Sequence, residues 1–196
     1  MSSPGKRIGV FGGTFDPPHI GHLVAALNTA SYLELDEVLF VVASVPWQKV
    51  GDSQISAVRD RLAMVELAVR GRTLLVSSRI EIERGGDSVT VETLLEIASA
   101  EPGAELFLIL GSDAAVGLST WRRADELVEL ATIVVVDRPG AEGRRPGPEF
   151  PFQTVTCPLV DLSSSELRQC VSEGRPIDYL VTDAVRDYIE DTGLYR

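Results

Sequence analysis

The stretch that decides the fold reads "RIGVFGGTFDPPHIGHLVAALNTASYLEL" and covers residues 7–35. It begins with a short apolar run that ends in a glycine pair, a pattern typical of a buried strand. After an Asp-Pro-Pro turn, apolar residues recur at the spacing of an amphipathic helix. A strand, a tight glycine-rich loop and a helix in this order predict the first unit of a sheet whose loop faces a ligand crevice.

The rest of the chain repeats this alternation of apolar runs and amphipathic segments. We expect strands at residues 37–44, 73–78, 105–111 and 132–137, and helices at residues 57–71, 89–100, 124–131, 163–174 and 182–193. Because strands that are apolar throughout must be covered on both faces, the fold class is predicted to be α/β. The expected architecture is a Rossmann-like, doubly wound parallel sheet with helices on both faces and a small C-terminal helical segment.

The length of 196 residues predicts a single domain over residues 1–196, with residues 1–6 disordered. Residues 139–153 are rich in Pro, Gly and Arg, so we expect a mobile loop there. No internal repeat is apparent in the sequence.

Charge and composition exclude several classes of partner. The formal net charge of -11 argues against nucleic acid, because phosphate backbones are bound mainly by clustered Lys and Arg. The longest apolar runs fall well short of the roughly 20 residues that cross a bilayer, so no membrane is expected. Cys157 and Cys170 lack the C-x-x-C spacing and are expected to be reduced thiols. These features together predict a cytoplasmic protein.

The loop after the first predicted strand carries the chemistry. Gly12 and Gly13 let a phosphate approach the backbone closely. His19 and His22 are the only two histidines of the chain, and they fall on nearly the same face at the amino end of a helix. That end is positive, which favours an anion site. The simpler alternative is that each histidine is a surface or capping residue, and a zinc pair is disfavoured because no third ligand stands at motif spacing.

Two segments also resemble the signatures of the HxGH nucleotidyltransferase superfamily. The first is "GGTFDPPHIGH", residues 12–22, and the second is "LSSSELR", residues 162–168. The segments "PWQK", "DSVTVETL", "GSDAAVGLSTW" and "DRPG" are similar to those of nicotinate-mononucleotide adenylyltransferases. The resemblance covers nearly the whole chain from Arg7 onward, except residues 140–154.

This resemblance implies adenylyl transfer from ATP to nicotinic acid mononucleotide, giving nicotinic acid adenine dinucleotide and pyrophosphate in NAD biosynthesis. The attacking phosphate oxygen is already an anion, so no general base is required. Catalysis would then depend on holding two polyanions in line and on stabilising the charge of the leaving pyrophosphate. Mg²⁺ is the expected companion of ATP, held largely by phosphates and water rather than by protein ligands. A homo-oligomer is compatible with the family.

The resemblance also implies roles for individual residues. The catalytic residues would be His19, His22 and Arg168. ATP would contact Gly12, Gly13, Thr14, Phe15, His19, His22, Lys49, Gly111, Asp113, Arg138, Ser163, Ser164 and Arg168. The mononucleotide would contact Asp16, Lys49, Thr90, Asp113 and Trp121, with Trp121 stacking on the pyridine ring and Thr90 near the nicotinate carboxylate. Arg61 is expected to be structural.

Simpler roles remain open for several of these residues. Ser163, Ser164 and Asp113 are also typical helix caps, and Trp121 could belong to the core. Val89 stands where many relatives have tyrosine, which leaves the pocket lining open. Ser165 replaces a usual threonine and Leu162 a usual isoleucine, which are mild changes.

Two other functions compete. Phosphopantetheine adenylyltransferase shares both signatures, but it normally has threonine in place of His19 and would not need the segments "DSVTVETL" and "STW". A non-catalytic nucleotide sensor on the same fold would be favoured by loss of a histidine or of Arg168, and neither is lost. The sequence leaves the preference between the acid and the amide mononucleotide open.

Overall fold

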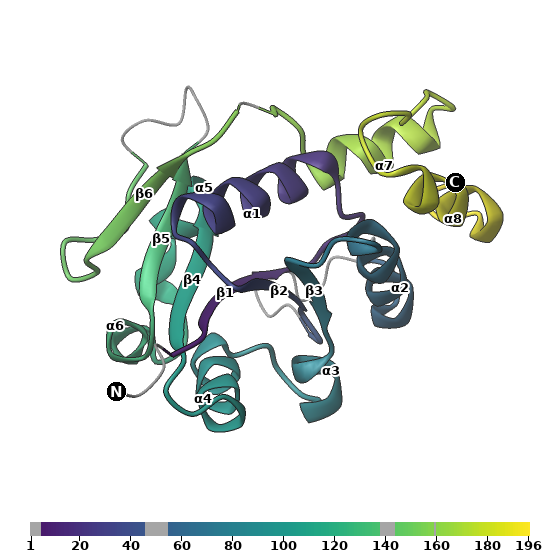
Figure 1. Ribbon diagram of the computed structural model, residues 1–196. Coiled ribbons are helices and arrows are strands. Elements are labelled where there is room, and N and C mark those ends of the chain that lie inside the picture. The colour runs from purple at the N-terminus through teal and green to yellow at the C-terminus, as the bar shows by residue number, and fades with distance from the viewer. Residues whose placement is uncertain (1–4, 46–54, 138–143, 159) are drawn as a thin grey trace.

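A computed structural model describes residues 5–45, 55–137, 144–158 and 160–196 (Figure 1). Its centre is a six-stranded sheet in the order β3-β2-β1-β4-β5-β6, and all neighbouring strands are parallel. The strands are β1 Arg7–Gly13, β2 Glu37–Val42, β3 Leu75–Ser78, β4 Glu105–Gly111, β5 Thr132–Asp137 and β6 Phe152–Thr156. The order reverses between β1 and β4, so a crevice is expected where these two strands end.

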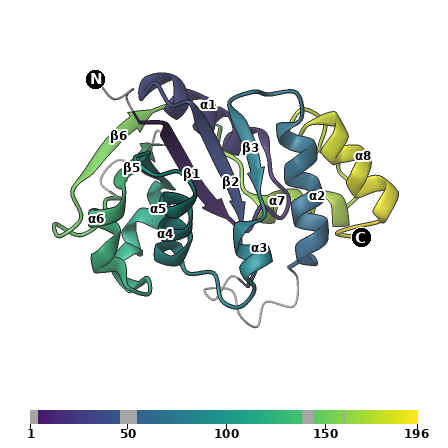
Figure 2. The ribbon, with the colours of Figure 1, turned by 60° about the horizontal axis from the view of Figure 1, so that its bottom comes forward.

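Helices cover both faces of the sheet, as Figures 1 and 2 show. They are α1 Ile20–Tyr32, α2 Val58–Val69, α3 Ile80–Arg84, α4 Thr90–Ala100, α5 Ser112–Val116, α6 Leu127–Leu130, α7 Ser164–Ser172 and α8 Asp183–Thr192. The core of one face includes residues of α1 and α2, and the core of the other includes residues of α4 and α6. Helices α7 and α8 form a third apolar cluster with the outer side of α2.

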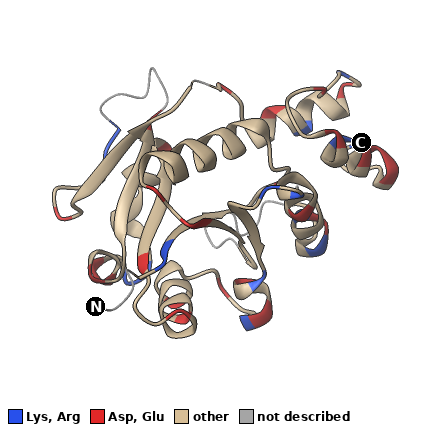
Figure 3. Cartoon of the chain, in the orientation of Figure 1, with Lys and Arg blue, Asp and Glu red and all other residues tan. Residues whose placement is uncertain are grey.

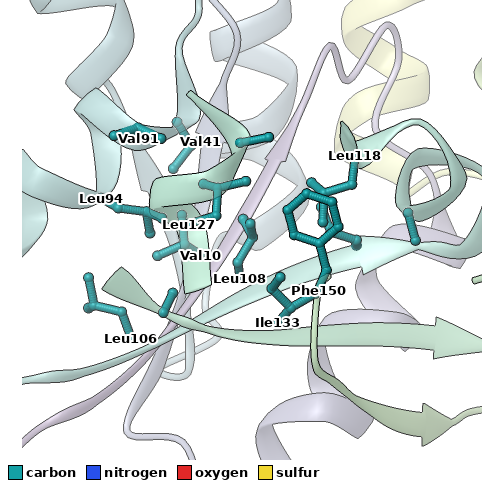
Figure 4. Packing of buried hydrophobic residues seen from close by; sticks show 14 of the residues in the cluster. Val10, Val41, Val91, Leu94, Leu106, Leu108, Leu118, Leu127, Ile133 and Phe150 are labelled. Carbon is teal, nitrogen blue, oxygen red and sulfur yellow. The ribbon is translucent and has the colours of Figure 1, made fainter. Parts of the chain in front are cut away.

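Each central strand feeds both cores because its side chains alternate between the two faces. Leu108 of β4 packs with Val91 and Leu94 of α4 in one core (Figure 4), whereas its neighbour Ile109 packs on the opposite face. Both faces are therefore apolar, which explains the continuous apolar runs in the sequence. Figure 3 shows the charged residues mainly on helices and at strand ends.

The predicted doubly wound parallel sheet and the C-terminal helical segment are confirmed. Strands β1 and β4 end where the glycines predicted. Helix α3 lies in a polar segment, residues 79–88, for which no helix was predicted. In the described part of the chain, no helix combines the length and apolarity needed to cross a bilayer.

The predicted mobile loop over residues 139–153 is wrong in its last part. Phe150 is 4% exposed and packs in the core (Figure 4), and strand β6 begins at Phe152. Phe150 is buried although the residues before it are rich in Pro and Gly, and Val155 of β6 is buried as well. These two residues anchor the end of the predicted loop and the strand that follows it. Residues 139–143 lie outside the described residues.

The prediction of disorder over residues 1–6 is also wrong at its end. Lys6 forms ion pairs with Glu37 at 3.0 Å and Glu101 at 3.6 Å. These contacts raise the pKa of Lys6, chiefly through its hydrogen bond with Glu37. Residues 1–4 lie outside the described part of the chain.

Candidate active site

A pocket of about 230 Å³ opens at the carboxyl ends of β1 and β4. It brings together six residues that the sequence predicted for the site: Gly12, Gly13, Thr14, Thr90, Gly111 and Trp121. Its walls also include four polar residues that were not predicted: Glu81, Ser88, Thr93 and Arg122. An added Cβ at Gly12 would meet nothing within 4 Å, so the backbone there is open to a ligand.

The pocket combines an aromatic wall with buried polar atoms. In the described residues, Trp121 Nε1, Ser88 Oγ and Glu81 Oε2 are buried and have no hydrogen-bond partner. The other carboxylate oxygen, Glu81 Oε1, accepts a hydrogen bond from Thr93 Oγ1 at 2.8 Å. Buried polar atoms usually have partners, so these three favour a ligand with polar groups. A flat ring with polar substituents suits this lining.

Residues 12–22, here called the histidine loop, lead from the pocket to helix α1. His22 Nδ1 accepts a hydrogen bond from the His19 backbone N–H at 3.1 Å, and the two ring centroids are 3.7 Å apart. A neutral His22 ring therefore carries its proton on Nε2, which makes Nε2 a donor. An added Cβ at Gly21 would lie 3.0 Å from His19 Nδ1, so glycine leaves room for that ring. The H-x-G-H spacing thus stacks both imidazoles at the amino end of α1.

Aromatic rings fix the orientation of His22. Its ring centroid lies 5.1 Å from that of Phe15 and 6.0 Å from that of Phe11. Phe15 also packs against Phe40 and is 3% exposed. The buried ring of Phe15 therefore packs against the His22 ring. The backbone of Phe15 remains for its predicted contact with ATP.

The second signature lies directly against the histidine loop. Ser164 Oγ donates a hydrogen bond to the Pro17 carbonyl at 2.8 Å, and Arg168 Nη1 donates to the Asp16 carbonyl at 2.9 Å. Arg168 Nη2 also donates to Ser165 Oγ at 3.3 Å. Ser164 and Pro17 are 147 positions apart in the sequence, and Arg168 and Asp16 are 152 apart. The fold therefore brings the two signatures into direct contact.

The hydroxyls of Ser163 and Ser164, two of the predicted site residues, form hydrogen bonds within the protein. Ser163 caps α7, since its Oγ accepts a hydrogen bond from the Glu166 backbone N–H at 3.2 Å and its own N–H donates to the Glu166 carboxylate. Ser164 Oγ is committed to Pro17, as described above. The capping interpretation is confirmed for Ser163. The candidate donors of α7 to an anion are the backbone amides at its amino end and the Arg168 guanidinium.

Arg61 is a buried structural residue, as predicted. It is 2% exposed, and its guanidinium donates hydrogen bonds to three backbone carbonyls: Thr14 at 3.0 Å, Ser56 at 3.1 Å and Ser44 at 3.2 Å. Burial lowers the pKa of Arg61, and the nearby Asp16 carboxylate opposes that shift. Arg61 thus ties the histidine loop to the segments that flank the site.

The Asp16 carboxylate points into the protein. It is 2% exposed, and its two oxygens accept hydrogen bonds from the Ser56 N–H at 3.0 Å and the Tyr195 hydroxyl at 2.6 Å. Both carboxylate oxygens thus accept hydrogen bonds from the protein itself, and the substrate contact of Asp16 stays a prediction. Sequence reasoning did not single out Tyr195.

The remaining predicted residues lie at the rim or beyond the described part. Asp113 is exposed and forms an ion pair with Arg144, while its neighbour Ala114 lines the pocket. Arg122 of the pocket wall pairs with Asp87 at 2.7 Å. Lys49 and Arg138 lie outside the described residues.

Comparison with solved structures supports the fold. Plasmodium falciparum nicotinic acid mononucleotide adenylyltransferase complexed with NaAD has a TM-score of 0.79 at 19% sequence identity, with 97% of each chain covered. The same protein complexed with APC has a TM-score of 0.77 at 18% identity. At this identity, the likeness shows a shared fold.

Sequence comparison goes further. Residues 10–170 match the cytidylyltransferase-like family. A relative from Frankia casuarinae, named probable nicotinate-nucleotide adenylyltransferase, is 44% identical and covers 94% of this chain and 98% of its own. A relative of the same name from Geobacillus thermodenitrificans is 42% identical and covers 96% of this chain and 86% of its own. With this identity over nearly its whole length, the chain belongs to the nicotinate-nucleotide adenylyltransferases of the cytidylyltransferase-like family.

Proposed function

We propose that the protein transfers the adenylyl group of ATP to nicotinic acid mononucleotide. The observation that carries this proposal is the direct contact of Ser164 and Arg168 with the histidine loop, beside a pocket with an aromatic wall. In this reaction, a 5′-phosphate oxygen of the mononucleotide attacks the α-phosphorus of ATP. The bond from that phosphorus to the bridging oxygen breaks, and pyrophosphate leaves with the electron pair.

The residues divide this work between two places. The pocket holds the pyridine nucleotide, with Trp121 as the stacking surface and the Ser88 hydroxyl near the ring substituent. His19, His22, Arg168 and the amino ends of α1 and α7 hold the phosphates of ATP. Since the nucleophile is already anionic, these groups act by alignment and by stabilising negative charge on the leaving group.

A divalent cation, Mg²⁺, enters with ATP in this proposal. Within the described ranges, no group of three or more His, Cys, Asp or Glu side chains could hold a metal ion by itself. In such sites Mg²⁺ is usually held mainly by phosphate oxygens and water, so it requires no such group of protein ligands. The cation would neutralise phosphate charge, while His19, His22 and Arg168 orient the chain of phosphates.

Pyrophosphate release with a panel of acceptors tests the proposal. We expect release when ATP and Mg²⁺ are combined with nicotinic acid mononucleotide, and a parallel assay with the amide measures the preference between the two. Addition of a chelator should stop the reaction. Release only with phosphopantetheine would replace the proposal by the sister activity, and no release with any acceptor would favour a nucleotide sensor.

Trp121→Ala should weaken binding of the mononucleotide. Stacking of an aromatic side chain on a base is worth roughly 1–3 kcal/mol, so we expect KM for the mononucleotide to rise about 5- to 160-fold. KM for ATP should change by less than about twofold, because the ring lies in the other half of the site. Trp121→Phe is the matched variant and should recover most of the affinity. Unchanged mononucleotide affinity in Trp121→Ala would place the ring outside the site.

A further inference from the structure

Tyr195 reaches the histidine loop from the far end of the sequence. Its hydroxyl donates a hydrogen bond to Asp16 Oδ1 at 2.6 Å, across 179 positions, and lies 3.8 Å from the Met64 sulfur. Burial raises the pKa of Tyr195, and the hydrogen bond to Asp16 adds to the shift, so the hydroxyl keeps its proton at neutral pH. It is therefore a permanent donor to Asp16.

The backbone that delivers Tyr195 adopts an unfavourable conformation. Tyr195 has a φ of 67°, in the left-handed region that residues with a side chain rarely adopt. Gly193 ends α8 with a φ of 68°, where glycine has no such cost. Strained residues persist where surrounding contacts hold them, so the contacts of Tyr195 outweigh this cost.

Four sets of contacts fix the histidine loop just before its histidines. Arg61 holds the Thr14 carbonyl, Arg168 holds the Asp16 carbonyl, and Ser164 holds the Pro17 carbonyl. The fourth set is the Asp16 carboxylate, which receives the Ser56 N–H and the Tyr195 hydroxyl. Three of the sets use donors that the sequence suggested as structural or functional. Tyr195 is the side-chain donor of the fourth set, and the sequence suggested no role for it.

We propose that Tyr195 is a positioning residue, which acts through Asp16 to fix the histidine loop so that His19 and His22 face the phosphates together with Arg168. Its catalytic effect rests on the proposed function, whereas its effect on the loop does not. Tyr195 touches no reacting atom in this proposal. Loss of its hydroxyl should leave the pocket in place while the loop loses one of the two hydrogen bonds that hold the Asp16 carboxylate.

The chain offers a matched control for this hydroxyl. Tyr188 of α8 donates a hydrogen bond to Asp60 Oδ1 of α2 at 2.9 Å. Tyr188→Phe therefore removes the same group, bonded to the same kind of acceptor, from the same C-terminal segment. Any general loosening of that segment should affect Tyr188→Phe and Tyr195→Phe alike, and only Tyr195→Phe should affect the loop.

The test compares both variants by NMR and by steady-state kinetics. The chain has two histidines, so its imidazole spectrum reports on the histidine loop alone. We expect both imidazole signals to shift or broaden in Tyr195→Phe and to stay in place in Tyr188→Phe. The kcat of Tyr195→Phe should fall about tenfold, with both KM values within about twofold of wild type, because misplacement of catalytic groups lowers kcat first.

Asp16→Ala gives a second, independent variant. It removes both carboxylate oxygens, which accept hydrogen bonds from Tyr195 and Ser56, so it should cause similar histidine shifts. The double variant with Tyr195→Phe should lower kcat no further than the worse single variant, because both changes remove the same Tyr195–Asp16 hydrogen bond. Additive losses would contradict a shared contact.

The outcomes separate this proposal from the proposed function. Equal imidazole spectra and equal kcat values for Tyr195→Phe and Tyr188→Phe would overturn the positioning role. A wild-type protein without adenylyl transfer to any acceptor would overturn the proposed function, and the histidine signals would still decide the role of Tyr195. Should Tyr195→Phe fail to fold, the Asp16→Ala spectrum decides, since unchanged histidine signals there would equally refute the proposal.

Discussion

His22→Ala should lower kcat by about 100- to 1000-fold, the range seen when one donor to a developing oxyanion is removed. The structure gives the reason. His22 Nδ1 accepts from the His19 backbone, so the ring presents Nε2–H as a donor, and Phe15 and Phe11 hold the ring in that orientation. Steady-state pyrophosphate release at saturating ATP and mononucleotide measures the loss.

His22→Asn separates catalysis from folding in this prediction. The asparagine side chain can accept the hydrogen bond from the His19 N–H, but it offers nothing in place of Nε2. We therefore expect His22→Asn to lose as much kcat as His22→Ala. His22→Ala also loses the hydrogen bond from the His19 N–H at the start of α1, which should cost roughly 1 kcal/mol of stability. His22→Asn should keep that hydrogen bond and that stability. Near-normal turnover in His22→Asn would remove the catalytic role of the imidazole.

Arg61→Met should lower the free energy of unfolding by about 3–5 kcal/mol, as expected when one partner of a buried charge network is removed. The change leaves the carbonyls of Thr14, Ser44 and Ser56 without their donor. It also leaves the buried Asp16 carboxylate without its neighbouring cation. Urea unfolding followed by circular dichroism measures the effect.

Arg59→Met is the control for Arg61→Met. Arg59 lies on the same helix two positions earlier, and its side chain is 87% exposed. Its replacement should change stability by less than about 0.5 kcal/mol, as surface substitutions usually do. Arg61→Lys should lie between the two, because an ammonium keeps the charge but lacks the planar fork of donors. Wild-type stability in Arg61→Met would mean that these hydrogen bonds contribute nothing net.

Local patterns predicted the elements that their own residues define. The glycines at the ends of β1 and β4 and the apolar runs before them set both strands correctly. Strand β6 was missed because most of its residues are exposed at the edge of the sheet, so it carries no continuous apolar run. Helix α3 was missed because five residues give too short a pattern to recognise.

The candidate site likewise contains residues that local sequence predicted and residues that it did not. His19, His22 and the glycines were found because they stand close together in one loop. The partners of Asp16 were not found, since no local pattern links Asp16 to Tyr195, and a carboxylate next to a glycine loop suggests a ligand contact. Glu81 gave no signal either, because its burial depends on how α3 packs and the surrounding segment is polar.

The floor of the pocket is also the hydrophobic core. Val10, Leu108 and Leu110 line the pocket and belong to the core cluster beneath it. A change of volume at these positions alters folding and ligand fit together, so mutations that reshape the floor are constrained by the need to fold. Divergence in substrate choice within this architecture should therefore accumulate at polar residues of the pocket wall, where Ser88 and Arg122 lie outside the sheet and its core clusters.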